Sequence, residues 1–457
     1  MVYDVIVVGG GVAGLTSAWI LGRKGFSVAL IESKPRERIG TKPCGDAIGL
    51  HHFRELGFEP PASVIENKFY GVRVYSPSEE HYITVYGEGI GINSLRFHQW
   101  LLREALDSGV ELLDRHVLWS ISVKEGFVDK VVVKKKGVAG HIELRAKAYI
   151  DASGATPALR LKLPREWPIA EKPYTTDYNI TYREIIELNE PVDSENRRYA
   201  HIYLNKDIAP GGYWWFFPKK DGSIANMGLG VIWRSGSPNP RSQYDRFLRT
   251  RFKGRAIDIG GGLVPTRRPL PTLVWRNVCV VGDAAYTVNP VHGGGKGSSM
   301  LAASIIARHL GDAIEAGRVD EETLWGVNID YLKAYGSKQA MLDILRMYLQ
   351  MLSNSDLEFL FKKKIVSGDA VYDIGMKGSL REELVRNIKA ALSLIGRPSL
   401  LNQLRMVKRY MDTANKLYLE VYPREPGGLK EWIGRVEELY NRFTATIGFE
   451  KGSVVRW

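Results

Sequence analysis

Two glycine clusters, each beside an acidic residue, are the parts of this chain best suited to chemistry. The first follows the apolar run 5–8 and contains Gly9, Gly11, Ala13 and Gly14. This spacing predicts a strand, a tight turn and a helix start that let the backbone approach a dinucleotide pyrophosphate. A second apolar run, 28–31, ends in Glu32 and Ser33, where the carboxylate can accept hydrogen bonds from the ribose of an adenosine.

The second cluster indicates which dinucleotide is bound. The apolar run 278–281 ends in Gly282 and Asp283, and this carboxylate is placed to meet the ribityl hydroxyls of a flavin. A helix predicted over 298–310 follows Pro290, Gly293, Gly294 and Gly295. Its start aims N–H groups and a positive dipole end at the negatively charged pyrimidine edge of a reduced flavin. The two clusters together predict FAD as the cofactor.

Several layers of structure are needed to position these clusters. The N-terminal strand, helix and strand are typical of a Rossmann unit, and strands alternate in period two over 174–263. Amphipathic stretches follow at 341–351, 381–394 and 401–419. We therefore predict an α/β fold: a Rossmann-type FAD-binding domain, an inserted antiparallel β-sheet substrate domain and a C-terminal helical domain. The predicted boundaries are 1–60, 90–160 and 270–330 for the FAD-binding domain, 61–89 and 161–269 for the substrate-binding (catalytic) domain, and 331–457 for the helical domain.

Composition, apolar run length and net charge limit the classes of protein to which this chain can belong. The chain has 457 residues, 44% of them hydrophobic and 25% charged, with a formal net charge of +12. Apolar runs are too short to span a bilayer, and the first strand begins by Tyr3, which predicts a cytoplasmic protein without a signal peptide. The positive charge favours peripheral contact with an anionic membrane at the inner face of the cell membrane. Acids and bases are interspersed, so we expect no nucleic-acid partner.

The loop 42–46, which reads Lys-Pro-Cys-Gly-Asp, is the candidate reactive segment. Basic neighbours such as Lys42 favour the thiolate form of Cys44, which is the nucleophilic form. The alternative is that Cys44 is a small residue filling a tight turn. The second of the two cysteines, Cys279, lies in an apolar run and is expected to be inert core. So few cysteines exclude a disulfide scaffold and a cysteine zinc site, and we expect no metal.

A run of aromatic residues over 213–217 is the candidate apolar wall. Alternation along a strand puts Tyr213, Trp215 and Phe217 on one face. Such a run is either core packing or the wall of a ligand site, and the pattern alone leaves both open.

The glycine clusters, Arg96 and the turn 148–154 resemble the FAD flavoprotein superfamily that includes p-hydroxybenzoate hydroxylase. The resemblance implies that Arg96 reaches the FAD phosphates and that the turn ending in Gly154 closes over the adenine side. In the hydroxylases this turn reads Asp-Gly with a downstream Ser and Arg and helps NADPH approach, whereas here it reads Asp-Ala-Ser-Gly and keeps only Arg160. The electron donor is therefore open between ferredoxin, another low-potential donor and reduced nicotinamide.

Two further motifs, the loop 42–46 and the Pro-Gly-Gly-Tyr-Trp-Trp-Phe-Phe-Pro segment 210–218, resemble the archaeal geranylgeranyl reductase family, and the segment 289–297 agrees. The resemblance implies an FAD-dependent reductase that saturates carbon–carbon double bonds of geranylgeranyl chains in archaeal membrane lipid biosynthesis. The substrate would be a digeranylgeranylglycerophospholipid or geranylgeranyl diphosphate. Beside the flavin ring it implies the catalytic residues Cys44, Gly45 and Asp46, which also contact the cofactor. Along an apolar tunnel it implies the substrate-binding residues Tyr213, Trp215, Phe217, Pro218 and His292.

Two other functions are compatible with the same patterns. A flavin aromatic hydroxylase would use the fold to activate oxygen, and a prenyl-lipid carrier would bind the chain without reducing it. A carrier has no need for the second glycine cluster, which favours an enzyme. The proton donor stays open among Cys44, Asp46, His51, His52, His292 and an ordered water.

Overall fold

The computed structural model describes residues 2–377 and 397–456, so the amphipathic stretch predicted at 381–394 lies outside the described residues. The strands are β1 (Val2–Val8), β2 (Val28–Ile31), β3 (Ala47–Gly49), β4 (Ile65–Tyr75), β5 (Tyr82–Ile92), β6 (Glu111–Leu113), β7 (His116–Lys124), β8 (Phe127–Lys135), β9 (Ile142–Asp151), β10 (Tyr178–Leu188), β11 (Tyr199–Tyr203), β12 (Trp214–Lys219), β13 (Ile224–Ile232), β14 (Gly254–Pro265), β15 (Val274–Trp275) and β16 (Val278–Val280). The helices are α1 (Val12–Arg23), α2 (His51–Leu56), α3 (Ser94–Asp107), α4 (Pro240–Phe247), α5 (Lys296–Glu315), α6 (Gly326–Tyr331), α7 (Ser337–Met351), α8 (Asn354–Lys362), α9 (Gly368–Lys377), α12 (Pro398–Leu419) and α13 (Leu429–Ile447).

The first sheet, sheet A, has β1 at its centre. Its strand order is β15-β16-β9-β1-β2-β6, and β1 pairs in parallel with both β2 and β9. The side chains of Val5, Ile6 and Val7 are fully buried, as expected for a parallel strand covered on both faces. Strands β7 and β8 join β9 as an antiparallel meander. The carboxyl ends of β1, β2 and β16 thus bring the two glycine clusters to one edge of sheet A.

The second sheet, sheet B, is antiparallel except for one pair. Its order is β14-β10-β13-β12-β11-β4-β5-β3, and only β11 and β4 run parallel among the paired strands described. One face of sheet B packs beneath α4, where Trp214 and Phe216 join Tyr244 in a buried cluster. The opposite face carries Trp215 and Phe217. Alternation along β12 therefore separates the aromatic run into two faces.

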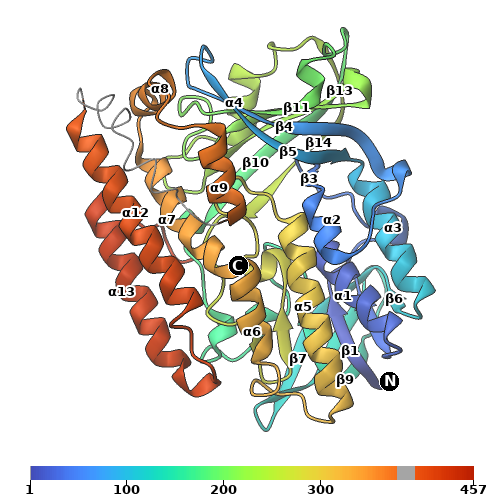
Figure 1. Cartoon of the computed structure of the whole chain (residues 1–457). Helices are drawn as coiled ribbons and strands as arrows, with labels where there is room; N and C mark the ends of the chain where they lie inside the picture. The colour runs from blue at the N-terminus through green and yellow to red at the C-terminus, as the bar shows by residue number, and fades with distance from the viewer. Residues whose placement is uncertain (1, 378–396, 457) are drawn as a thin grey trace.

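The C-terminal helices form a third layer, seen in orange and red at the left of Figure 1. Helix α7 packs against α12 and α13, and the Tyr440 hydroxyl of α13 donates to the Ala340 carbonyl of α7 at 2.7 Å. Helix α9 lies against β5 of sheet B. No helix within 2–377 and 397–456 is long and apolar enough to cross a membrane.

The predicted fold class is confirmed: an α/β arrangement with an antiparallel sheet and C-terminal helices. The division into domains stays a prediction. Strand β3 lies within the range 1–60 predicted for the FAD-binding domain, yet it pairs with β5 of sheet B. The loop that contains Cys44 thus leads directly from sheet A into sheet B.

Candidate active site

The first glycine cluster forms a close turn between β1 and α1. Gly9 has φ +109°, and a Cβ at Gly14 would collide with the Gly9 carbonyl oxygen. Gly11 is different, because the nearest atom to a Cβ there would be the Ala152 oxygen at 4.0 Å. Gly11 is also the N-cap of α1, which has neither a side-chain cap nor an acidic residue in its first turn. Free N–H groups and open space at Gly11 fit a bound phosphate.

Glu32 closes the other side of this turn. Its carboxylate accepts hydrogen bonds from the Gly10 and Lys34 amides at 2.7 and 2.8 Å and from the Ser33 hydroxyl at 3.2 Å. A cavity of about 490 Å³ begins at Ser33, and its lining comprises Ser33, Lys34, Pro35, Arg38, Arg115 and Lys136. The arrangement offers an acceptor and a space where the adenosine end of a dinucleotide would lie.

The second glycine cluster leads into α5. Gly295 is the N-cap of α5, and again no side chain caps the helix. Gly282 has φ +71°, and a Cβ there would approach the Ala13 side chain at 3.0 Å, so α1 and the 282–285 turn are in contact. The Asp283 carboxylate lies 2.5 Å from the Lys42 ammonium, and this ion pair raises the pKa of Lys42. Two uncapped helix starts therefore meet at one edge of sheet A, as the fit of a flavin dinucleotide requires.

The loop 42–46 crosses this edge. Lys296, the first residue of α5, donates to the Cys44 sulfur at 2.7 Å and lies 3.7 Å from Asp46 Oδ1. Burial opposes the charge of Lys296, but Cys44 and Asp46 outweigh it and raise the pKa of Lys296. The Cys44 sulfur thus has a buried cationic hydrogen-bond donor as its neighbour.

A buried ion network anchors the same loop to sheet B. The Lys219 ammonium, 4% exposed, lies 2.9 Å from Asp46 Oδ2 and 3.0 Å from Glu66 Oε2. Asn226 of β13 donates to the Cys44 carbonyl at 2.7 Å and accepts from the Trp215 indole N–H at 3.0 Å. Buried charges are stable only when paired and hydrogen-bonded, so these contacts fix the position of the loop.

The aromatic wall is defined here as Tyr213, Trp215 and Phe217, and it faces the loop. A Cβ at Gly45 would lie 3.1 Å from the Phe217 ring, and ring centroids of Trp215 and Phe217 are 6.3 Å apart. Tyr213 precedes β12, and its ring centroid is 6.1 Å from that of Trp215. Pro218 is buried within β12. The three rings share one face, as the alternation predicts, and pack with Phe69, Val72, Ala200 and Ile202.

His292 lies where the aromatic wall meets the second glycine cluster. The Tyr213 hydroxyl donates to the His292 carbonyl at 2.5 Å, and His292 Nδ1 accepts from the Gly294 amide at 3.1 Å. Pro290 is buried in the preceding turn, and a Cβ at Gly293 would lie 3.5 Å from Val264 of β14. These contacts bring the predicted substrate and cofactor residues of this segment together.

The contacts of Arg96 and Gly154, two residues predicted to bind FAD, do not themselves point to a cofactor. Arg96 is exposed, and its guanidinium donates to the Ser63 carbonyl at 3.3 Å. Gly154 has φ +97° and open space around it. Arg160 is 1% exposed and donates to the Tyr286 hydroxyl at 2.6 Å, so it points into the protein.

Sequence reasoning missed four residues of the site, namely Lys219, Asn226, Glu66 and Lys296. Lys296 follows the glycine triplet directly and Lys219 follows the aromatic run, so both had a local signal. Asn226 and Glu66 have no such signal in the sequence around them, because only the pairing of strands in sheet B brings them to the loop 42–46.

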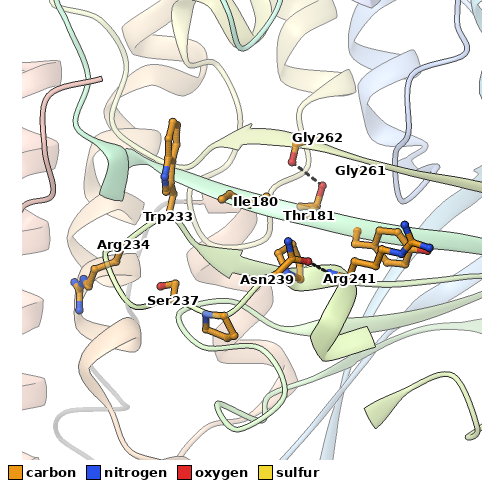
Figure 2. Close-up of a pocket in the computed structure, with 12 residues that line it drawn as sticks. Ile180, Thr181, Trp233, Arg234, Ser237, Asn239, Arg241, Gly261 and Gly262 are labelled. Atoms are coloured by element: carbon orange, nitrogen blue, oxygen red, sulfur yellow. Dashed lines mark hydrogen bonds between the residues drawn. The ribbon is translucent and has the colours of Figure 1, made fainter. Parts of the chain in front are cut away.

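A further cavity of about 530 Å³ lies beside β10, β14 and the segment 233–241 (Figure 2). In it the Thr181 hydroxyl donates to the Gly262 carbonyl at 3.0 Å and Asn239 accepts from the Arg241 amide at 2.9 Å. The residues that line it include none of the predicted site residues. The acidic, basic and thiol groups converge instead at the loop 42–46.

The family described as geranylgeranyl reductase catalytic domain matches residues 177–264, and the family described as lycopene cyclase protein matches residues 4–193. A digeranylgeranylglycerophospholipid reductase from Sulfolobus acidocaldarius is 38% identical over 450 residues, which cover 97% of this chain and 99% of the relative.

Solved structures share the fold. A geranylgeranyl bacteriochlorophyll reductase-like protein from Thermoplasma acidophilum superposes with a TM-score of 0.73 at 23% identity, covering 89% of this chain and 99% of the other. A probable FAD-dependent monooxygenase from Pseudomonas aeruginosa superposes with a TM-score of 0.59 at 18% identity, covering 79% and 100%. The chain thus shares the fold of these two proteins. With the near-complete match to the Sulfolobus relative, the chain belongs to the digeranylgeranylglycerophospholipid reductase family.

Proposed function

We propose that this protein is an FAD-dependent reductase that saturates carbon–carbon double bonds of geranylgeranyl chains in archaeal membrane lipid biosynthesis. The substrate is a geranylgeranyl phospholipid or geranylgeranyl diphosphate. The observation that carries the proposal is the convergence of the Cys44 loop, the start of α5 and the aromatic wall at one edge of sheet A.

FAD fits the residues present. Its pyrophosphate would lie at the uncapped start of α1, next to Gly9, Gly11, Ala13 and Gly14. Glu32 and Ser33 would bind the adenosine ribose, and Asp283 the ribityl chain, with the flavin ring near Gly293, Gly294 and Gly295. When bound and reduced, FAD supplies the hydride for an alkene. Arg96, Gly154, Gly282 and Pro290 complete the set of cofactor residues that we propose.

The chain's own residues meet the other needs of the reaction. An isolated alkene carries no carbonyl to polarise it, so protonation develops positive charge on carbon and needs a dry pocket with aromatic faces. Phe217 supplies such a face beside Gly45, and Trp215 lies next to Phe217. The Cys44 thiol accepts a hydrogen bond from Lys296, and Asn226 holds the Cys44 backbone carbonyl, so the thiol is placed to hold or deliver a proton.

Neither of the two alternatives, a flavin hydroxylase and a prenyl-lipid carrier, is supported by a comparable set of contacts. A hydroxylase that is reduced by NADPH would need the turn after β9 to receive the nucleotide, but Arg160 is buried against Tyr286. A carrier would need no cationic neighbour for a thiol beside the aromatic wall. Electron delivery by ferredoxin or another low-potential donor, and peripheral contact with an anionic membrane, remain part of the proposal.

A spectroscopic experiment tests the proposal. Purified protein should be yellow and contain FAD near one equivalent per chain. After reduction with dithionite under anaerobic conditions, addition of geranylgeranyl diphosphate or the phospholipid should restore the oxidised flavin spectrum. Colourless protein would favour the carrier, and oxygen consumption with a phenolic substrate would favour the hydroxylase.

A further inference from the structure

We infer that the protein docks on an anionic membrane through an exposed tryptophan and a group of basic residues around the loop between β8 and β9. The inference rests on the proposed function, because the candidate phospholipid substrate lies in a membrane, and it assigns the contact to particular residues. We define the docking face as Trp119, Val138, the lysine run 134–136, Lys34 and Arg115. These residues come from β2, β7 and β8 or the segments that follow and precede them.

The loop between β8 and β9 projects from the protein. Gly137 and Gly140 have φ +75° and +96°, and a Cβ at either position would meet no atom within 4 Å. Val138 lies between them and is 58% exposed. On the adjacent strand Trp119 is 57% exposed, and the Lys134 ammonium lies 3.4 Å from the centroid of its ring. Exposed apolar side chains next to lysines are typical of residues that enter the interface of an anionic bilayer.

The lysines of this loop differ from the other charged residues of the meander in having no acidic partner. Asp129 lies 3.0 Å from the Arg145 guanidinium, and Glu143 lies 2.8 Å from the Lys130 ammonium. Within residues 2–377 and 397–456, no carboxylate forms an ion pair with a lysine of the run 134–136, and Lys135 and Lys136 are exposed. Their charge is therefore available to an anionic surface.

Backbone hydrogen bonds connect this loop to a cationic cavity. The Lys136 amide donates to the Arg115 carbonyl at 2.7 Å, and the Arg115 amide donates to the Lys34 carbonyl at 3.1 Å. The carboxylates closest to the Arg115 guanidinium, those of Glu37 and Asp114, lie 3.8 Å from it. The cavity of about 490 Å³ that begins at Ser33 has four basic residues in its lining: Lys34, Arg38, Arg115 and Lys136. The loop and the cavity thus form one continuous basic surface.

The cofactor does not neutralise this surface. Burial lowers the pKa of Lys34, and the cations Lys42, Arg38 and Lys136 lower it further against the opposing effect of Glu32. The adenosine of FAD carries no charge, and in our proposal its pyrophosphate lies at the separate start of α1. A phosphate at the rim of the cavity would favour the charged form of Lys34. The basic surface therefore fits an anion other than the cofactor.

The apolar residues favour a membrane over an acidic protein or a nucleic acid. Basic groups alone would serve any acidic partner. Trp119 and Val138 lie beside these groups, and they gain from burial only where an apolar phase lies beneath a layer of anions. The surface of an anionic bilayer has this construction, with lipid phosphates above the hydrocarbon. The docking face thus matches a bilayer in both charge and apolarity.

Flotation of lipid vesicles tests the inference. The purified, flavin-containing protein is mixed at low ionic strength with vesicles of phosphatidylcholine, with or without phosphatidylglycerol. Binding to the anionic vesicles should weaken about twentyfold in Lys134→Gln, Lys135→Gln, because each basic residue near an anionic surface contributes about fivefold. Trp119→Ser should also weaken it. The matched control, Lys362→Gln, Lys363→Gln, removes the same charge from a segment whose neighbours Phe361 and Ile365 are buried, and should bind as the parent does.

Substrate presentation separates this inference from the proposed function. In Lys134→Gln, Lys135→Gln, turnover of geranylgeranyl diphosphate in solution should be unchanged, and turnover of the phospholipid in anionic vesicles should fall. Vesicle binding without reduction of either lipid would contradict the proposed function and leave the docking face standing. Equal weakening in the two lysine variants, or equal binding to neutral and anionic vesicles, would overturn the inference. Retention on a heparin column without vesicle binding would also overturn it, since the basic residues would then serve an acidic macromolecule.

Discussion

The ammonium nitrogen of Lys296 lies 2.7 Å from the Cys44 sulfur, although 252 residues separate the two in the chain. The contact joins the start of α5 to the loop that leads from sheet A into sheet B. It places a cation and a thiol next to the aromatic wall, where an alkene would receive a proton in the proposed reaction. Several measurable consequences follow from this pair and the network around it.

Removing the cation should slow the chemistry of the thiol. In Lys296→Met, alkylation of Cys44 by iodoacetamide should slow about tenfold near neutral pH, because the Cys44 sulfur loses its charged hydrogen-bond donor. Peptide mass spectrometry after timed alkylation measures the rate at each cysteine. Cys279 is the internal control, since burial raises its pKa to about 12 and keeps it unreactive. An unchanged Cys44 rate would mean that Lys296 serves only packing.

The thiol itself should matter for reduction and not for folding. Cys44→Ala should bind FAD and substrate normally but lose most of the reduction, and Cys44→Ser should lose somewhat less. Single-turnover reoxidation of dithionite-reduced enzyme by substrate isolates this step from the unknown donor. If the alanine variant reoxidises as fast as the parent, Cys44 is structural and the proton comes from another group.

The two glycines of the first cluster should respond differently to valine. Gly11→Val should fold, since a Cβ there meets no atom closer than 4.0 Å, but it should fill the space at the start of α1 and abolish FAD binding. Gly14→Val should misfold because its Cβ would collide with the Gly9 oxygen. Circular dichroism and flavin content distinguish the outcomes. Stoichiometric FAD in folded Gly11→Val would contradict the assignment.

Breaking the buried network should cost stability. Lys219→Met leaves the Asp46 and Glu66 carboxylates buried without their cation, which typically costs about 3–5 kcal/mol. Its thermal midpoint should fall by several degrees. The neighbouring exposed Lys220 provides the matched control, Lys220→Met, which should stay within about 0.5 kcal/mol of the parent. Equal losses of stability in Lys219→Met and Lys220→Met would contradict a stabilising role of the buried ion network.

Acid should destabilise the protein through its buried histidines. Burial lowers the pKa of His51 and His98 to about 4, against about 6.5 in the unfolded chain. Between these values the unfolded state binds more protons, so stability should be lost as pH falls from about 6.5 to 4. Thermal midpoints across this range measure the effect. A flat profile would contradict neutral buried histidines.

Local patterns predicted the elements better than the contacts between them. The runs before Gly9 and Gly282 form buried parallel strands, and the helix after Gly295 begins at Lys296, because strand, turn and helix signals lie within a few residues. Asp46, an ion-pair partner of Lys219, lies 173 residues away from it in the chain and is brought near by the pairing of strands in sheet B. Such a contact has no periodic signal. The roles assigned to Cys44, Asp46 and the aromatic wall remain predictions.

Mass spectrometry of the lipid product tests the central claim most directly. Geranylgeranyl diphosphate and digeranylgeranylglycerophospholipid are each incubated anaerobically with dithionite-reduced enzyme. The lipids are then extracted, and their masses are compared with those from a control that contains denatured enzyme. The account predicts the addition of one pair of hydrogen atoms for each double bond saturated, with at least one of the two lipids. Recovery of both lipids at their starting mass, from protein that contains FAD, would contradict it.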